Sequence, residues 1–169
     1  MKPWFVLLLS LVVAACSTVR VEGDPDFTLD EGGRYTWVAS ALEETDVDAP
    51  ISDYLHAVNA ELEQRGLVRA TTASSDYQID VSVVIEREVR DQDPVFSLFV
   101  ALEYEVAVLR VRIKETEGER RRWSGECRHD LRMVRRSFGG LPPMWEDLDR
   151  RREWLPEEQV DRIFARLAR

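Results

Sequence analysis

Two stretches of the chain carry apolar residues at the spacing of one helical face. In residues 51–66 they recur at offsets of 0, 3, 4, 7 and 11, at Ile51, Tyr54, Leu55, Val58 and Leu62. Near the C-terminus they recur at offsets of 0, 3, 4 and 7, at Val160, Ile163, Phe164 and Leu167. Pro50 suits a first helical turn, Gly66 suits a helix end, and the second stretch follows Pro156. The pattern therefore predicts two amphipathic helices.

Alternation of apolar and polar residues predicts three long strands between these helices. Residues 77–85 alternate with period 2, as a strand with one buried face does. Residues 104–113 begin in the same way, but the apolar positions change parity at Leu109, which predicts either a β-bulge or a stretch covered on both faces. Residues 123–127 form the third candidate, with His129 at its end. Two shorter candidates lie near residues 19–21 and at 34–38.

These elements predict an α+β fold. We expect a mostly antiparallel sheet of about four to five strands, with the two amphipathic helices packed on one face. The 169 residues, of which 44% are hydrophobic and 33% charged, suit a single globular domain. We expect that domain to span residues 16–169.

The first fifteen residues have the layout of a signal peptide. Lys2 is their only charged residue, and residues 3–15 form an uncharged run of 13, shorter than the roughly 20 apolar residues that span a bilayer. The sequence Val13-Ala14-Ala15-Cys16 then resembles the lipobox of bacterial lipoproteins, in which diacylglycerol alkylates the cysteine thiol and the chain is cut just before it. We therefore predict a lipoprotein signal peptide at residues 1–15 and lipidation at Cys16; the alternative is an ordinary secretory signal with a chance cysteine.

The residue after the cysteine predicts the membrane. In bacteria with two membranes, an Asp at this position tends to retain lipoproteins in the inner membrane, whereas this chain has Ser17. We therefore expect an outer-membrane lipoprotein whose domain faces the periplasm. Lipidation of Cys16 also leaves Cys127 as the one free thiol, and we expect it to be a buried, small hydrophobic residue.

The net negative charge of the chain disfavours one class of partner, and the charged residues are unevenly distributed along the sequence. The net charge of −9 disfavours general nucleic-acid binding, which needs surplus cations. Residues 21–64 hold twelve acidic side chains against Arg34 alone, whereas residues 110–136 hold ten basic side chains against five acidic ones. The basic region suits anionic lipid headgroups or an acidic partner. The alternative is that its arginines occupy the solvent faces of strands and a hairpin tip.

No catalytic or metal-binding motif stands out. Neither His56 nor His129 lies in a nucleophile motif, and we expect both to be partly exposed structural residues. The alternating acidic side chains of residues 24–30 resemble a calcium loop, but Leu29 occupies the position that requires glycine, so an acidic surface loop is favoured. Two cysteines and two histidines are too few for a disulfide framework or a Cys/His zinc site. We therefore expect no cofactor.

Two segments are richer in large apolar side chains than loops require. They are residues 90–103 and 137–154, and both combine aromatic or Met side chains with nearby charge, as interface centres do. The candidate interaction surface consists of Phe96, Phe99, Phe138, Met144, Trp145 and Trp154. The alternative is that both segments fold over the sheet as core.

The order of these pieces resembles the bacterial lipoproteins that carry domain of unknown function 4136. The resemblance rests on short motifs in the same order, namely Cys16-Ser17, Phe27 ahead of Tyr35-Thr36-Trp37, Leu62-Glu63-Gln64-Arg65-Gly66-Leu67, Ser75-Asp76-Tyr77, Leu109-Arg110-Val111-Arg112-Ile113 and Trp123-Ser124-Gly125-Glu126. The chain departs from the family at Ser75, where Ala is usual, and in residues 90–103, which lack the usual Gly and Tyr. The resemblance implies an envelope lipoprotein with an α+β domain and no established activity, and it assigns no catalytic residue.

These observations predict a lipid-anchored envelope lipoprotein that acts as a non-enzymatic binding or structural module. Its expected partners are the membrane, through Cys16, and an envelope protein or lipid. The alternative is a small periplasmic hydrolase whose site the sequence does not display. An activity screen separates the two, because turnover abolished by one carboxylate or histidine substitution would favour the hydrolase.

Overall fold

The computed structural model describes residues 18–38, 50–71, 74–91, 101–117, 122–137, 145–146 and 154–167. The predicted signal peptide and Cys16 lie outside these residues, so both stay predictions. In the described part of the chain, no helix is long and apolar enough to cross a membrane.

Seven strands form one sheet in the described residues. Their bounds are β1 Val19–Gly23, β2 Arg34–Trp37, β3 Val68–Arg69, β4 Tyr77–Asp91, β5 Ala101–Glu115, β6 Arg122–Ser137 and β7 Trp145–Glu146. The order across the sheet is β1-β6-β5-β4-β2-β3, and the short β7 pairs with β6. The α+β class is confirmed. The predicted number of four to five strands is too low, because β3 and β7 have two residues each and leave no periodic pattern.

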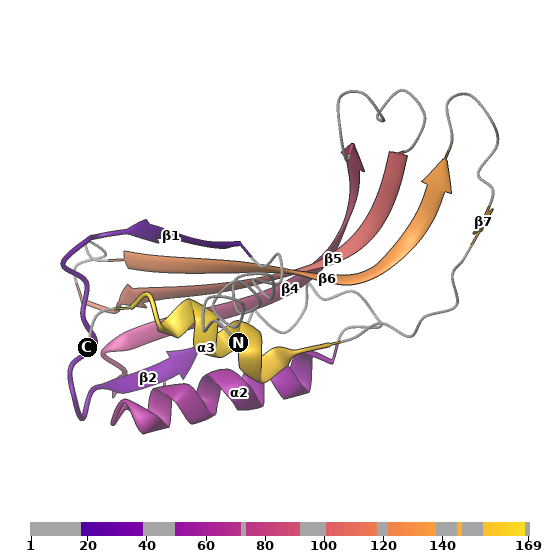
Figure 1. Cartoon of the computed structure of the whole chain (residues 1–169). Helices are drawn as coiled ribbons and strands as arrows, with labels where there is room; N and C mark the ends of the chain where they lie inside the picture. Colours follow the sequence, from indigo (N-terminus) through magenta and orange to yellow (C-terminus); the bar gives the residue numbers. More distant parts are fainter. Residues whose placement is uncertain are drawn as a thin grey trace, which may run out of the picture.

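The sheet is mixed, although most of its pairing is antiparallel. β4, β5 and β6 form the predicted meander, and β1 is antiparallel to β6. β2 runs parallel to both β3 and β4, because helix α2 (Ile51–Gln64) carries the chain back before the next strand begins. The two short strands at the N-terminal end, β1 and β2, therefore lie on opposite sides of the meander (Figure 1).

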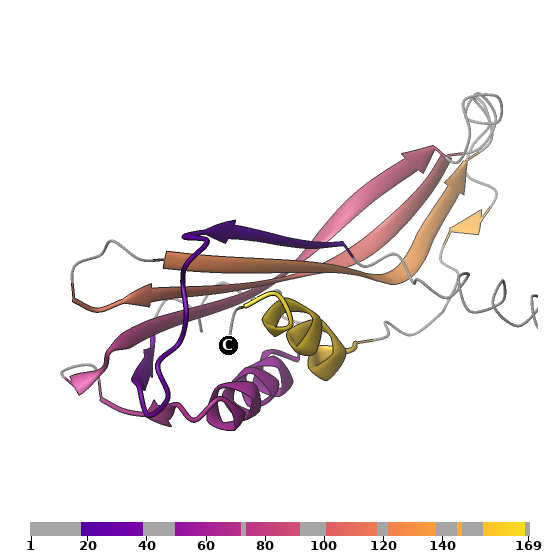
Figure 2. The same cartoon turned by 60° about the vertical axis from the view of Figure 1, so that its left-hand side comes forward.

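Helices α2 and α3 (Pro156–Phe164) lie on the same face of the sheet, as predicted (Figures 1 and 2). The buried apolar residues of these helices are Tyr54, Val58, Leu62, Val160, Ile163 and Phe164. They pack against odd-numbered residues of the meander, among them Ile79 and Leu109. This arrangement places the hydrophobic core between the helices and one face of the sheet.

The three long strands continue past the helices and curve away from them (Figure 2). Their pairing includes two register shifts, at Glu103/Tyr104 and at Glu105/Val106, and such irregularities bend a strand. β6 spans Arg122–Ser137 and is much longer than the predicted residues 123–127. His129 lies within β6, opposite Ala107, and the prediction that it ends the strand is wrong.

The change of parity at Leu109 is not a bulge. Val108 and Leu109 keep a regular register with Arg128 and Cys127 of β6. Residues 106–109 all have 0% of their surface exposed, so the sheet is covered on both faces at this point. Of the two predicted alternatives, the doubly covered stretch is the one confirmed.

Candidate functional site

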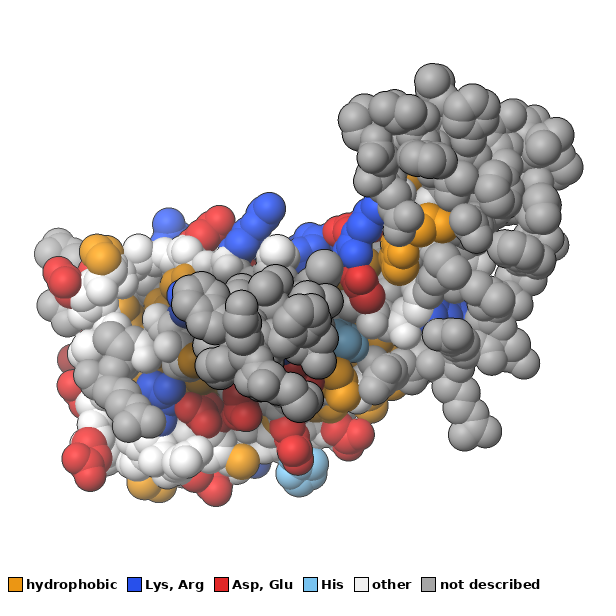
Figure 3. All heavy atoms as spheres, in the orientation of Figure 1, with side chains coloured by type: hydrophobic (Ala, Val, Ile, Leu, Met, Phe, Trp, Pro, Cys, Tyr) orange, Lys and Arg blue, Asp and Glu red, His pale blue; other side chains and the backbone are white. Residues whose placement is uncertain are grey.

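One face of the sheet carries neither helix, and we call it the open face. The helices cover odd-numbered residues of β4 and β5, so the even-numbered residues point to the open face. Its charged residues are Arg20, Glu22, Asp80, Glu86, Glu88, Arg90, Arg110, Arg112, Lys114, Arg122, Glu126, Arg128 and Asp130. Figure 3 shows basic and acidic side chains side by side along the upper margin of the molecule, where the open face is seen from the side.

Seven of these residues form one ion-pair network across three strands. Its members are Glu86, Glu88 and Arg90 of β4, Arg110 of β5, and Glu126, Arg128 and Asp130 of β6. Arg128 lies at the centre, 2.6 Å from a carboxylate oxygen of Glu86 and also in contact with Glu88. Arg110 donates to Glu126 at 2.7 Å, and Arg90 donates to both oxygens of Asp130 at 2.7 Å. The network ties β4, β5 and β6 together on the open face.

Hydrogen bonds within this network favour the charged forms of Glu88, Arg90 and Arg110. A hydrogen bond from Arg90 lowers the pKa of Glu88, and the hydrogen bond to Asp130 raises the pKa of Arg90. The hydrogen bond to Glu126 likewise raises the pKa of Arg110. A general acid or base needs a pKa moved toward neutrality, and these pKa values move away from it. The network is therefore suited to a fixed charged surface and not to proton transfer.

The network also borders an apolar strip. Val106 and Val108 point to the open face, yet both are completely buried. Their cross-strand neighbours include Glu86 and Arg128, whose side chains are held in the network. Because the long stem of an arginine covers apolar surface while its head stays in water, ion pairing here also stabilises the burial of both valines.

Acid should weaken this network. The pKa of Glu88 is lower in the folded protein than its ordinary value of 4.5. Its contribution to stability is therefore complete above about pH 4.5 and is lost as the pH falls through the folded-state pKa. We expect the free energy of unfolding in urea to fall as the pH drops below about 4.5, and to fall less steeply in Glu88→Gln. Glu157→Gln, on the exposed side of α3, is the control, and an unchanged slope in Glu88→Gln would contradict this account.

A groove of about 940 Å³ opens at the end of the open face where β1 finishes. Its lining includes Glu22 of β1, Arg112 and Lys114 of β5, and Arg122 of β6. The chain leaves β1 very close to β6, since the backbone N–H of Asp24 donates to the carbonyl of Arg122 at 3.0 Å. Gly23 permits this approach: its φ is +135°, and a Cβ there would collide with the Arg122 carbonyl. The tight end of β1 thus closes one side of the groove.

Several cations of this groove remain available. Arg20, Lys114 and Arg122 are exposed, and none of them forms an ion pair with another residue that the structure describes. Arg112 contacts Asp80 at 3.2 Å, but its side chain is 60% exposed and keeps further N–H donors free. The groove therefore presents basic groups that the network does not neutralise.

The helix side of the molecule has the opposite character. A second hollow between α2 and α3 is lined by the acidic residues Asp53, Glu61, Glu157, Glu158 and Asp161. His56 also lines it and is exposed, as predicted. Among the residues with described positions, no three or more His, Cys, Asp or Glu side chains form a group that could hold a metal ion. The free cations and this acidic hollow thus lie on opposite faces of the sheet.

The other predicted residues have mixed outcomes. Cys127 is completely buried, as expected, and burial raises the pKa of its thiol. Trp154 is half-buried and packs edge-on against Tyr54, with ring centroids 6.3 Å apart. The side chains of Phe96, Phe99, Phe138, Met144 and Trp145 lie outside the described residues. The proposed interaction surface therefore stays a prediction.

The acidic segment at residues 24–30 is a surface turn, in keeping with the favoured interpretation. The Asp24 carboxylate accepts a hydrogen bond from the backbone N–H of Asp26 at 3.0 Å. The Asp30 carboxylate accepts one from the Tyr77 hydroxyl at 3.1 Å. Two of these carboxylates are thus bonded within the protein itself.

The ion-pair network was not predicted from the sequence. The only available signal was charge at alternate positions, as in Glu86, Glu88 and Arg90. That signal predicts a solvent-facing strand but does not say which strand lies opposite. The partners of Arg128 on β4 are 40 and 42 residues away in the sequence, so only the register reveals them.

Comparison with known proteins leaves the family unassigned. No known family matches the sequence, and neither does any curated protein. The solved structures with similar shapes include PelC of Paraburkholderia phytofirmans, a dodecamer, at 12% identity and a TM-score of 0.49 over 89% of this chain and 95% of PelC. A PDZ domain protein from Parabacteroides distasonis is similar at 12% identity and a TM-score of 0.39 over 67% of this chain and 31% of that protein. We draw no functional conclusion from either.

Proposed function

We propose that this chain is a lipid-anchored, non-enzymatic binding module of the cell envelope, held at the periplasmic face of the outer membrane through Cys16. One observation carries the proposal: β1 begins at Val19, three residues after the lipobox cysteine, and forms an edge of the sheet. Three extended residues span at most about 10 Å. An anchor at Cys16 would therefore keep the sheet itself, and not a long flexible linker, at the bilayer surface.

Binding suits the described surface better than catalysis does. The open face is an array of paired acidic and basic side chains, and the groove at its end keeps exposed cations. Fixed charges of this kind steer and orient a partner, whereas the pKa shifts in the network oppose acid–base chemistry. The expected partner is an envelope protein or a lipid.

Replacing Cys16 with alanine should release the protein from the outer-membrane fraction. Each acyl methylene buried in a bilayer contributes about 0.8 kcal/mol, and stable anchoring needs two or more signals, so loss of the lipidated cysteine removes the anchor. Cell fractionation measures the outcome, and mass spectrometry of the wild type should show the acyl chains on Cys16. Cys127→Ala, which changes the other cysteine, is the control. If Cys16→Ala stays in the outer-membrane fraction, the anchor is wrong.

A further inference from the structure

Two exposed cations face each other across neighbouring strands in the open-face groove. Lys114 of β5 is paired in register with Arg122 of β6, and Gln78 of β4 lies on the other side of Lys114. Like charges directly opposite each other on one face of a sheet are destabilising. Within the described residues neither cation has an ion-pair partner. A bound anion would remove this repulsion.

The next row of the sheet adds two more donors. Arg112 and Ser124 are paired in register, one step along from Lys114 and Arg122. Arg112 keeps free N–H groups, and Ser124 is a half-buried residue of the open face. Guanidinium, ammonium and hydroxyl groups at adjacent positions on one face of a sheet are a donor set that suits a phosphate.

Neighbouring carboxylates limit what this site accepts. Four carboxylates line the same groove, those of Glu22, Asp24, Asp80 and Glu126, with Glu22 opposite Ser124 and Asp80 opposite Arg112. A polyanion lying along the groove would meet several of these carboxylates, whereas a single phosphate between Lys114 and Arg122 meets a cross-strand pair that is basic on both strands. The site therefore fits an isolated phosphate group better than a nucleic acid or another dense polyanion.

The lipid anchor would hold the groove close to such phosphates, which are part of the phospholipid headgroups. Gly23, at the groove, is seven residues from Cys16, so the two lie at most about 24 Å apart along an extended chain. The open face carries the free cations, whereas the hollow on the helix side is lined by five carboxylates, of which Glu61 and Glu158 are paired with arginines. Anionic headgroups would attract the first surface and repel the second.

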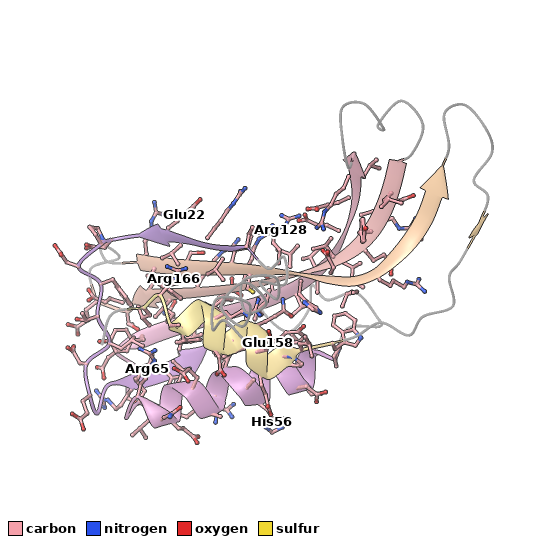
Figure 4. The ribbon with its side chains drawn as sticks, in the orientation of Figure 1. Glu22, His56, Arg65, Arg128, Glu158 and Arg166 are labelled. Atoms are coloured by element: carbon pink, nitrogen blue, oxygen red, sulfur yellow. The ribbon has the colours of Figure 1, made fainter. Side chains whose placement is uncertain are left out.

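We infer that the open face docks on the membrane and that the phosphate of a phospholipid headgroup binds between Lys114, Arg122 and Arg112. The inference rests on the proposed lipid anchor. It orients the domain: β1 and the groove lie against the headgroups, and α2 and α3 face the periplasm. Figure 4 shows the two sides, with Glu22 on β1 and His56 on α2.

Cysteine accessibility in nanodiscs tests this orientation. The mature lipidated protein with Glu22→Cys or with His56→Cys is reconstituted into phosphatidylglycerol nanodiscs and into galactolipid nanodiscs, which contain no phosphate. A charged maleimide then reports exposure, and the buried Cys127, whose thiol pKa is raised by burial, gives little background. We expect the modification rate of Glu22→Cys to be about tenfold lower in phosphatidylglycerol than in galactolipid, and that of His56→Cys to be equal in both.

Charge-matched variants show whether the phosphate site is responsible. Lys114→Gln with Arg122→Gln should restore fast modification of Glu22→Cys in phosphatidylglycerol. Arg69→Gln with Arg166→Gln removes the same charge from exposed positions outside the groove and should leave the protection intact. Equal rates in the two lipids, or protection of His56→Cys in place of Glu22→Cys, would overturn the docking alone. A chain that elutes apart from the nanodiscs would overturn the anchor and the docking together.

Discussion

Replacing Gly125 with valine should destabilise the domain by about 3 kcal/mol, because overpacking a tight core forces side chains and backbone to shift. Gly125 lies on β6 where α3 crosses the sheet. A Cβ at this position would lie 2.7 Å from Cη2 of Trp123 and would collide with Cγ2 of Ile163. Both neighbours are buried, with 3% and 0% of their surface exposed, so neither can move into solvent. Urea denaturation monitored by circular dichroism measures the loss.

Two comparisons separate this clash from a general intolerance of valine in β6. Ser124→Val places the same side chain on the open face and should change stability by less than about 0.5 kcal/mol. Ile163→Ala removes the side chain that Gly125→Val would strike, so the double variant should lose less stability than the sum of the two single variants. Strictly additive losses would show that the helix does not constrain Gly125.

The main helices and strands of this fold could be predicted from the local pattern of apolar and polar residues. The helical spacing from Ile51 to Leu62 and the alternation beginning at Tyr77 each describe one buried face, and both elements lie where they were predicted. The doubly covered stretch around Leu109 was also visible as a change of parity. Where burial is decided by neighbours along the chain, the amino-acid sequence is informative.

The pairing between strands that are distant in the sequence could not be predicted in the same way. The parallel position of β2 beside β4 depends on the path of α2, and the ion-pair network depends on the register of β4, β5 and β6. Lys114 and Arg122 each belong to a basic stretch that the sequence analysis noted, but only the register places them opposite each other. The candidate site is therefore a property of strand register, which short two-residue periodicity does not determine.

Replacing Gln159 with alanine should also cost about 3 kcal/mol, because it leaves two buried groups without partners. Gln159 has 2% of its surface exposed and lies between α2 and β6. Its side-chain oxygen accepts a hydrogen bond from the Tyr54 hydroxyl at 2.5 Å, and its amide donates to the Cys127 carbonyl at 3.2 Å. Burial raises the pKa of Tyr54, so the hydroxyl stays protonated and remains a donor. Chemical denaturation at neutral pH measures the effect.

The neighbouring residue on α3 provides the matched control for Gln159→Ala. Glu158→Ala removes an exposed side chain whose contact is an ion pair with Arg162 one turn away, and it should cost less than about 0.5 kcal/mol. Tyr54→Phe removes the hydroxyl that Gln159→Ala leaves without an acceptor, so the double variant should be more stable than additivity predicts. If the two losses simply add, the hydrogen bond between Tyr54 and Gln159 does not link α2 to α3 energetically, and the cost of Gln159→Ala must come from lost packing and from the unpaired Cys127 carbonyl.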